Sequence, residues 1–209
     1  VYLREGYSMS DVFTTGILQR GRDGKLVEEG NGYQVDRSQR IRLGSADPDF
    51  TMGWRHDINY KNISLGLMIT GRFGGIVTSQ TQAFMDAFGV SKVSAEARDN
   101  GGVMLDGHRY DAERYYNTVG GQGLMSYYTY DATNVRLQEL SLTYSLPKKW
   151  LGDVFNNATI SFVGRNLFMF YRKAPFDPDM NGSTGTYNRS DFFMAPSLRN
   201  LGFSIKFSL

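Results

Sequence analysis

Apolar side chains recur at every second position in five segments of this chain. The segments are Phe50–Tyr60, Ile63–Phe73, Asn134–Leu146, Ala158–Tyr171 and Leu201–Leu209. Because the side chains of a strand alternate between its two faces, this period predicts strands with one apolar and one polar face. Two polar residues interrupt the apolar positions: His56, which we expect to be a satisfied or interfacial histidine, and Asn166.

The third segment changes phase within itself. Val135 and Leu137 share one parity, whereas the apolar residues from Leu140 onward share the other. One extra residue near Gln138 or Glu139, a β-bulge, would keep all of these side chains on one face. The first two segments are separated by Lys61 and Asn62 alone, which predicts a tight hairpin.

The connections between the five strands alternate between short and long. In order they have about 2, 60, 11 and 26 residues, and about 49 residues without sustained alternation precede the first strand. Outer-membrane barrels have short periplasmic turns and long extracellular loops, and their strands need about 9–11 residues to cross a bilayer. The pattern therefore predicts an all-β fold, an antiparallel transmembrane β-barrel with long extracellular loops. A soluble β-sandwich is the alternative.

Apolar alternation continues to Leu209, the last residue printed. A membrane barrel must pair its last strand with its first, so a chain that closes the barrel needs no polar tail. Five strands are too few for a bacterial barrel, which has at least eight. We therefore expect residues 1–209 to be the C-terminal portion of a larger barrel, without its plug domain and earlier strands. Arg72, Arg136 and Arg165 would then face the lumen.

With the C-terminus on the periplasmic side, the loop lengths fix a complete topology. The 2- and 11-residue turns are periplasmic, and the 60- and 26-residue loops are extracellular. Within the longer loop, Ala83–Phe88 and Asp106–Asn117 are candidates for short helices.

Composition excludes several classes of function. The chain has no cysteine and two histidines, which rules out thiolate metal sites, thiol catalysis and a three-histidine metal site. A net charge of +2 indicates no nucleic-acid partner. No catalytic constellation is present, so we expect a protein that is not an enzyme and has no cofactor.

Several stretches resemble the late barrel segments of SusC/RagA-type TonB-dependent outer-membrane transporters. They are LGSADPDFTMGW (43–54), DATNVRLQELSLTYSLPKKWL (131–151), ISFVGRNLFMFYRKAPFDPDMN (160–181) and PSLRNLGFSIKFSL (196–209), in the same order and spacing as in that family.

The resemblance implies a plugged barrel of about 22 strands in the cell outer membrane. It also implies import of glycan fragments or peptides, energy supplied by TonB through the absent N-terminal region, and a SusD-like surface lipoprotein as a lid. Barrels of this kind commonly end on an aromatic residue that the barrel-assembly machinery reads. Here that signal would comprise Phe203, Ile205, Phe207 and Leu209, and the sequence departs from the family in ending on Leu209, with Phe207 two residues before it. Two other functions stay open: a SusC-like structural subunit of an envelope assembly, and a soluble glycan-binding β-sandwich.

Three groups of residues are candidates for binding. DPDMNG (177–182) begins like a calcium loop, with Asp177, Asp179 and Asn181 as ligands, although Asn188 stands where that motif needs a glutamate; a turn with side-chain-to-backbone bonds is the alternative. Tyr127, Tyr128 and Tyr130 would stack on substrate or form an interfacial girdle. The partner-docking candidates in the long loop are Tyr110, Arg114, Tyr115 and Tyr116, for which packing on the barrel rim is the alternative.

Overall fold

The computed structural model describes residues 5–151, 155–179 and 190–208. The chain divides into two compact units. The sheet unit comprises Pro48–Gly74, Ala132–Asp179 and Pro196–Leu209, and the mixed unit comprises Val1–Asp47, Gly75–Asp131 and Met180–Ala195.

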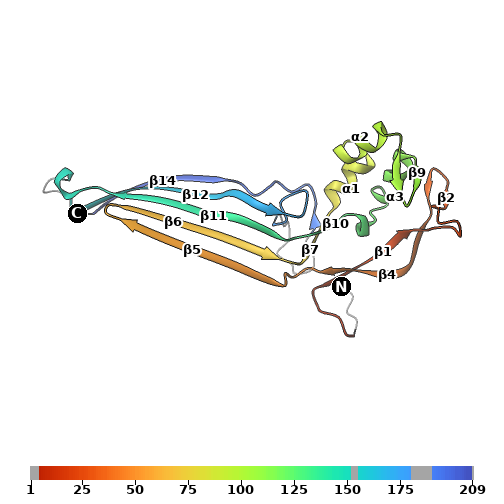
Figure 1. The fold of residues 1–209 in the computed structure, drawn as a ribbon, viewed down its shortest axis with the longest axis horizontal. Helices are drawn as coiled ribbons and strands as arrows, with labels where there is room; N and C mark the ends of the chain where they lie inside the picture. Colours follow the sequence, from red (N-terminus) through yellow and green to blue (C-terminus); the bar gives the residue numbers. More distant parts are fainter. Residues whose placement is uncertain (1–4, 152–154, 180–189, 209) are drawn as a thin grey trace. The chain divides into compact units, whose positions relative to one another are not determined.

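The sheet unit is built on five long antiparallel strands (Figure 1). They are β5 (Phe50–Tyr60), β6 (Ile63–Phe73), β11 (Asn134–Ser145), β12 (Asn157–Arg172) and β14 (Asn200–Ser208). Their order across the sheet is β14-β12-β11-β6-β5, so each strand pairs with its neighbour among the five predicted segments. A short helix η2 (Lys148–Trp150) lies in the connection between β11 and β12. The all-β antiparallel prediction is confirmed.

Register aligns the apolar positions of the five strands into continuous rows. One row crosses the whole sheet, with each residue directly opposite the next: Ile58, Leu65, Leu142, Phe162 and Phe203. The next row toward the β5–β6 turn contains Tyr60, Ile63, Tyr144, Ile160 and Ile205. Residues that lie opposite one another in a ladder share a face. The sheet therefore has one apolar face across its full width.

The opposite face of the sheet is polar and carries small side chains near the β5–β6 turn. One row contains Asn59, Ser64, Thr143, Ser161 and Ser204, and the Thr143 and Ser161 hydroxyls are hydrogen-bonded at 2.9 Å. A Cβ at Gly66 would approach Ser141 Oγ to 2.5 Å, so a larger residue there would force the serine hydroxyl to move. We call this surface the polar face.

Bulges keep the two faces distinct along the central strands. The pairing of β11 with both neighbours shifts between Leu137 and Glu139, which leaves Gln138 as the extra residue. The predicted bulge is confirmed. Asn166 and Leu167 are the extra residues of β12 at the same level, and Asn166 has a left-handed φ of 53°. This bulge removes Asn166 from the apolar alternation that it interrupts in the sequence.

The mixed unit combines one long strand pair and several strands of two to four residues with three α-helices. Its strands are β1 (Asp11–Leu18), β2 (Glu28–Glu29), β3 (Gly32–Tyr33), β4 (Val35–Ser45), β7 (Ile76–Ser79), β8 (Val103–Leu105), β9 (His108–Tyr110), β10 (Thr129–Asp131) and β13 (Ser190–Asp191). Its helices are α1 (Gln80–Ala87), α2 (Lys92–Asp99), α3 (Ala112–Val119) and the 3-10 turn η1 (Met125–Tyr127). Two short helices were expected, and a third, α2, lies between them. No helix in the described ranges is long and apolar enough to cross a membrane.

Each of the three α-helices begins at a side-chain cap. Ser79, Ser91 and Asp111 each accept a hydrogen bond from a backbone N–H of the first turn.

The long antiparallel pair β1–β4 was not expected, because the sequence before Phe50 shows no sustained alternation.

Candidate functional site

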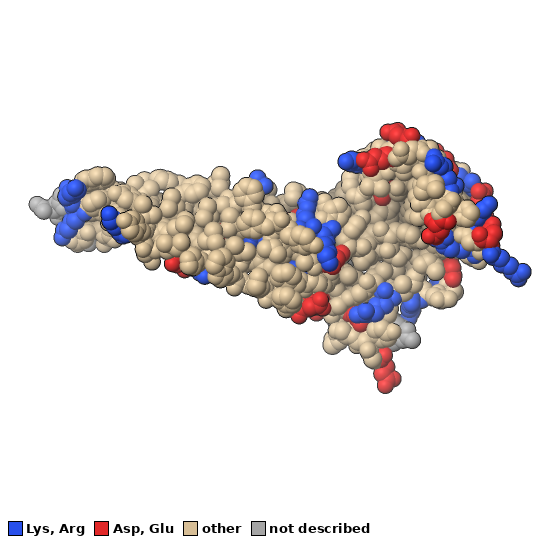
Figure 2. Space-filling model, viewed as in Figure 1, with Lys and Arg blue, Asp and Glu red and all other residues tan. Residues whose placement is uncertain are grey.

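The sheet unit exposes large apolar side chains over its apolar face. Trp54, Phe168, Phe203 and Phe207 are between 52% and 67% exposed. The main cluster of buried hydrophobic side chains in the described residues lies instead in the mixed unit and includes Leu26, Tyr115 and Leu124. In the view of Figure 2, charged side chains are sparse over the five strands and gather over the helices of the mixed unit. A wide apolar face of this kind is suited to an apolar surrounding such as lipid.

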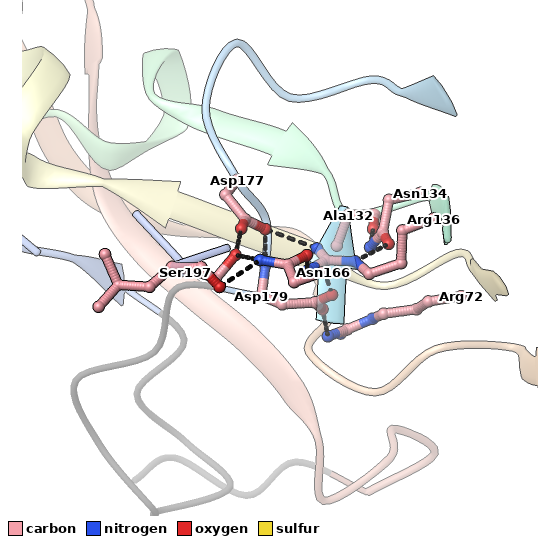
Figure 3. A network of polar contacts seen from close by, with 9 residues as sticks. Arg72, Ala132, Asn134, Arg136, Asn166, Asp177, Asp179 and Ser197 are labelled. Carbon is pink, nitrogen blue, oxygen red and sulfur yellow. Dashed lines mark hydrogen bonds and ion pairs between the residues drawn. The ribbon is translucent and has the colours of Figure 1, made fainter. Parts of the chain in front are cut away.

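Charged and amide side chains gather on the polar face, at the end of the strands away from the β5–β6 turn (Figure 3). We call them the loop-base cluster, because they join the strands to the chain segments on either side of the long loop that follows β12. Its members are Arg72, Asn134, Arg136, Asn166, Asp177, Asp179 and Ser197.

Arg136 is the centre of the loop-base cluster. Its Nη2 lies 2.7 Å from Asp177 Oδ1 and 2.7 Å from Asp179 Oδ2, and its Nη1 donates to Asn166 Oδ1 at 3.0 Å. Its side chain is 6% exposed, and that of Asp177 is 9% exposed. Arg72 Nη1 lies 3.7 Å from Asp179 Oδ1, so two guanidinium groups face two carboxylates. A buried charge is costly without such partners, and this arrangement supplies them.

Ser197 and Asn166 tie the returning chain to the same cluster. Ser197 Oγ donates to Asp177 Oδ2, and Asn166 Nδ2 donates to Ser197 Oγ at 2.8 Å. The segments before and after the long loop are thereby clamped to each other and to β11 and β12.

The environment of Asp177 favours its ionised form. Burial by itself raises the pKa of this carboxyl group, but hydrogen bonds from Ser197 and Arg136 outweigh burial and hold the pKa below its ordinary value. Asp177 therefore carries its charge at neutral pH, as its pairing with Arg136 requires.

The DPD stretch forms a turn of the kind expected as the alternative to calcium binding. The backbone N–H of Asp179 donates to Asp177 Oδ1 at 3.1 Å, which is an Asx turn. Both carboxylates contact arginine, and no group of three metal-ligating side chains occurs in the part of the chain that the structure describes. Asn181 lies outside the described residues, and the calcium site stays a prediction.

Four of the tyrosines proposed for partner or substrate binding are buried instead. Tyr110, Tyr115, Tyr116 and Tyr128 are 3–8% exposed and belong to the core of the mixed unit. Burial raises the pKa of the phenol groups of Tyr115 and Tyr128. Their rings pack against residues from the first 33 positions, among them Leu18 and Tyr33, which the local sequence could not indicate. These four side chains are thus unavailable to a partner in this structure.

The other three candidates of that group are less buried. Tyr127 is 39% exposed, although its hydroxyl accepts a hydrogen bond from the Leu18 backbone N–H at 3.3 Å. Tyr130 is half-buried against the same core. Arg114 pairs with Glu28 at 3.2 Å and lies over the ring of Tyr33.

The arginines expected in a lumen all project from the polar face. Arg72 lies opposite Thr51 and Asn134, Arg136 opposite Thr70, and Arg165 opposite Glu139, with which it forms an ion pair at 2.9 Å.

Of the residues proposed as an assembly signal, Phe203, Ile205 and Phe207 lie on the apolar face, and Leu209 lies outside the described residues. The sequence did not indicate a role for Asn134 and Ser197, because asparagine and serine are common polar residues and no motif marks these two positions. Asn166 was noted only as an interruption.

Replacing Asn166 separates backbone strain from hydrogen bonding. Asn166→Ala removes the amide contacts and leaves a residue with a Cβ at φ 53°, so we expect a loss of about 2–3 kcal/mol in unfolding free energy. Asn166→Gly also loses the contacts but tolerates the left-handed backbone, and should lose about 1 kcal/mol less. Urea titration of the folded receptor in lipid measures both values; equal losses would show that the backbone conformation contributes nothing.

Comparisons with known proteins found relatives by sequence and similar solved structures by fold. The chain is 29% identical over 222 residues to TonB-dependent receptor P3 of Formosa agariphila, covering 97% of this chain and 22% of that receptor. It is 26% identical over 156 residues to TonB-dependent receptor P26 of the same organism, covering 73% of this chain and 15% of that receptor. It therefore spans about a fifth of the length of these relatives. No protein-family profile matches the chain.

Solved structures give the same result at the level of the fold. The RagAB peptide importer in its open-open state matches with a TM-score of 0.64 at 15% identity, covering 100% of this chain and 24% of that chain. The RagAB peptide transporter matches with a TM-score of 0.58 at 13% identity, covering 94% of this chain and 22% of that chain. The chain is therefore similar in sequence to two TonB-dependent receptors, and it shares its fold with the matched part of the RagAB structures.

Proposed function

We propose that the receptor containing this chain is a TonB-dependent nutrient importer of the outer membrane, and that the sheet unit is a section of its barrel wall. The observation that carries the proposal is the row from Ile58 to Phe203, which is apolar on all five strands, while the row beside it on the other face is small and polar. A barrel wall between lipid and a water-filled lumen requires this alternation, because lipid rejects charge and the lumen accepts it.

Peptides are the substrate class that the comparisons favour over glycan fragments. The matched solved structures are titled as a peptide importer and a peptide transporter. Import would require parts of the receptor beyond this chain: the segment that engages TonB, the plug, and a SusD-like lipoprotein as lid. The barrel-assembly machinery would insert the strands into the membrane. A receptor that assembles in the outer membrane but imports no peptide would favour the alternative of a structural subunit.

The topology of the proposed barrel gives a direct test. The tight turn at Lys61–Asn62 should be periplasmic, and the connection between β6 and β11 should be extracellular. An epitope inserted at Gly101, in that connection, should bind antibody on intact cells, whereas the same epitope at Asn62 should bind only after the outer membrane is permeabilised. Antibody binding at Asn62 on intact cells would overturn this orientation. Comparable membrane levels of the two insertion variants provide the control.

A further inference from the structure

The segment that follows β12 folds back on the sheet instead of leaving it. Ala174 is 2% exposed, Asp177 is 8% exposed, and Pro178 is among the fully buried side chains. The partners of Asp177 and Asp179 are Arg136 of β11 and Arg72 of β6, which are both polar-face residues. Asp177 and Asp179, at the end of this segment, therefore lie against polar-face residues of two neighbouring strands (Figure 3).

The guanidinium group of Arg136 makes two of the ionic contacts that fix this path, and Arg72 makes a third. Arg136 bridges Asn166 on β12 to both carboxylates of the segment, using Nη1 for the amide and Nη2 for the carboxylates. A lysine ammonium at the same position would lack the two-pronged planar geometry that reaches these groups together. The matching bulges in β11 and β12, at Gln138 and at Asn166–Leu167, lie beside these contacts. Bulges of this kind redirect side chains locally.

From this geometry we infer that Arg136 is a positioning residue, which holds residues 173–179 as a strap across the lumen side of the barrel wall. The strap narrows the route beside β6, β11 and β12. It presents to that route the carboxylate of Asp179, whose side chain is 38% exposed, next to Arg72. A charged or polar solute that travels along this wall would pass this ion pair. The inference rests on the proposed function, because the polar face borders a route for solutes only if it lines a lumen.

The test uses single-cysteine reporters in the full receptor in its native outer membrane. A membrane-impermeant maleimide added from outside should label Asp179→Cys faster than Phe176→Cys, since Phe176 is half-buried. Adding Arg136→Gln to the Phe176→Cys reporter should raise its labelling rate about tenfold or more. Adding Arg136→Lys should also raise the rate. Arg165→Gln is the matched control on the same face, where the pair with Glu139 is more exposed, and it should leave the rate unchanged.

Equal labelling rates in the Arg136→Gln and Arg165→Gln backgrounds would overturn the strap. If Arg136→Gln prevents assembly, Asp177→Asn combined with Ser197→Ala loosens the same contacts more gently, and an unchanged rate there would overturn the strap equally. Recovery of the parent receptor in the outer membrane is scored separately. Absence of the parent from that fraction would refute the proposed function, whereas a correctly located parent with uniform rates would refute the strap alone.

Discussion

Ile205→Lys is expected to reduce the amount of assembled barrel strongly, while Ser204→Lys next to it has a small effect. Ile205 lies in the apolar row with Ile160, whereas Ser204 lies in the polar row with Ser161. A lysine on the lipid side near the bilayer centre costs about 2–4 kcal/mol, whereas a lumen position accepts it. Heat-modifiable mobility on gels, which distinguishes folded from unfolded barrels, measures the assembled fraction.

Substitution of Ile205 by a different apolar residue controls for loss of packing. Ile205→Leu should assemble like the parent, since it keeps the face apolar. Equal losses from lysine at 204 and at 205 would contradict the assignment of the two faces.

Arg136→Gln is expected to lower the unfolding free energy by about 3–5 kcal/mol, because it leaves the buried carboxylate of Asp177 without its cation. Arg165→Gln removes an ion pair from the same face of the sheet, but Arg165 is 64% exposed and Glu139 is 28% exposed. Solvent screens that pair, so its removal should cost less than about 1 kcal/mol. Urea-induced unfolding of the two variants in liposomes gives both values.

The double variant separates lost attraction from uncompensated burial. Asp177→Asn in the Arg136→Gln background removes the orphaned charge and should restore part of the lost stability. Two results would show that the loop-base cluster is not a coupled ionic network. One is a loss of unfolding free energy in Arg136→Gln that is no larger than the loss in Arg165→Gln. The other is a double variant whose loss equals the sum of the losses in Arg136→Gln and Asp177→Asn.

The five long strands could be predicted because their apolar face is exposed over its whole width, so that the apolar residues alternate regularly along each strand. Whether a face of such a sheet is apolar or polar depends on the residue types at alternate positions, and these can be taken directly from the sequence. The bulge at Gln138 could be predicted for the same reason, because an extra residue is needed to keep Val135 and Leu140 on one face. Loop lengths followed directly from the strand boundaries.

The mixed unit was much less predictable. The β1–β4 pair is interrupted by register shifts at Val12/Phe13 and Thr15/Ile17, and β4 carries charged residues on both parities, so no period survives. Tyr110 and Tyr115 were proposed for partner docking because they are aromatic residues in a long loop. They are buried instead against residues such as Leu26, which are distant in sequence. The pairing of Arg136 with Asp177 likewise joins positions 41 residues apart. Ionic partners at this separation are set by the folded register, and no local pattern encodes them.

The central claim is that the apolar face of the sheet contacts lipid and the polar face contacts water. Spin labels on single cysteines at Leu142 and Thr143, neighbours on the central strand β11, test it most directly in the full receptor in liposomes. Leu142 lies in the apolar row and Thr143 in the polar row. The label at 142 should be relaxed more by oxygen, which concentrates in lipid, than by a water-soluble nickel chelate, and the label at 143 should show a lower ratio of oxygen to nickel relaxation. Equal ratios at the two positions, or the reverse order, would contradict the account.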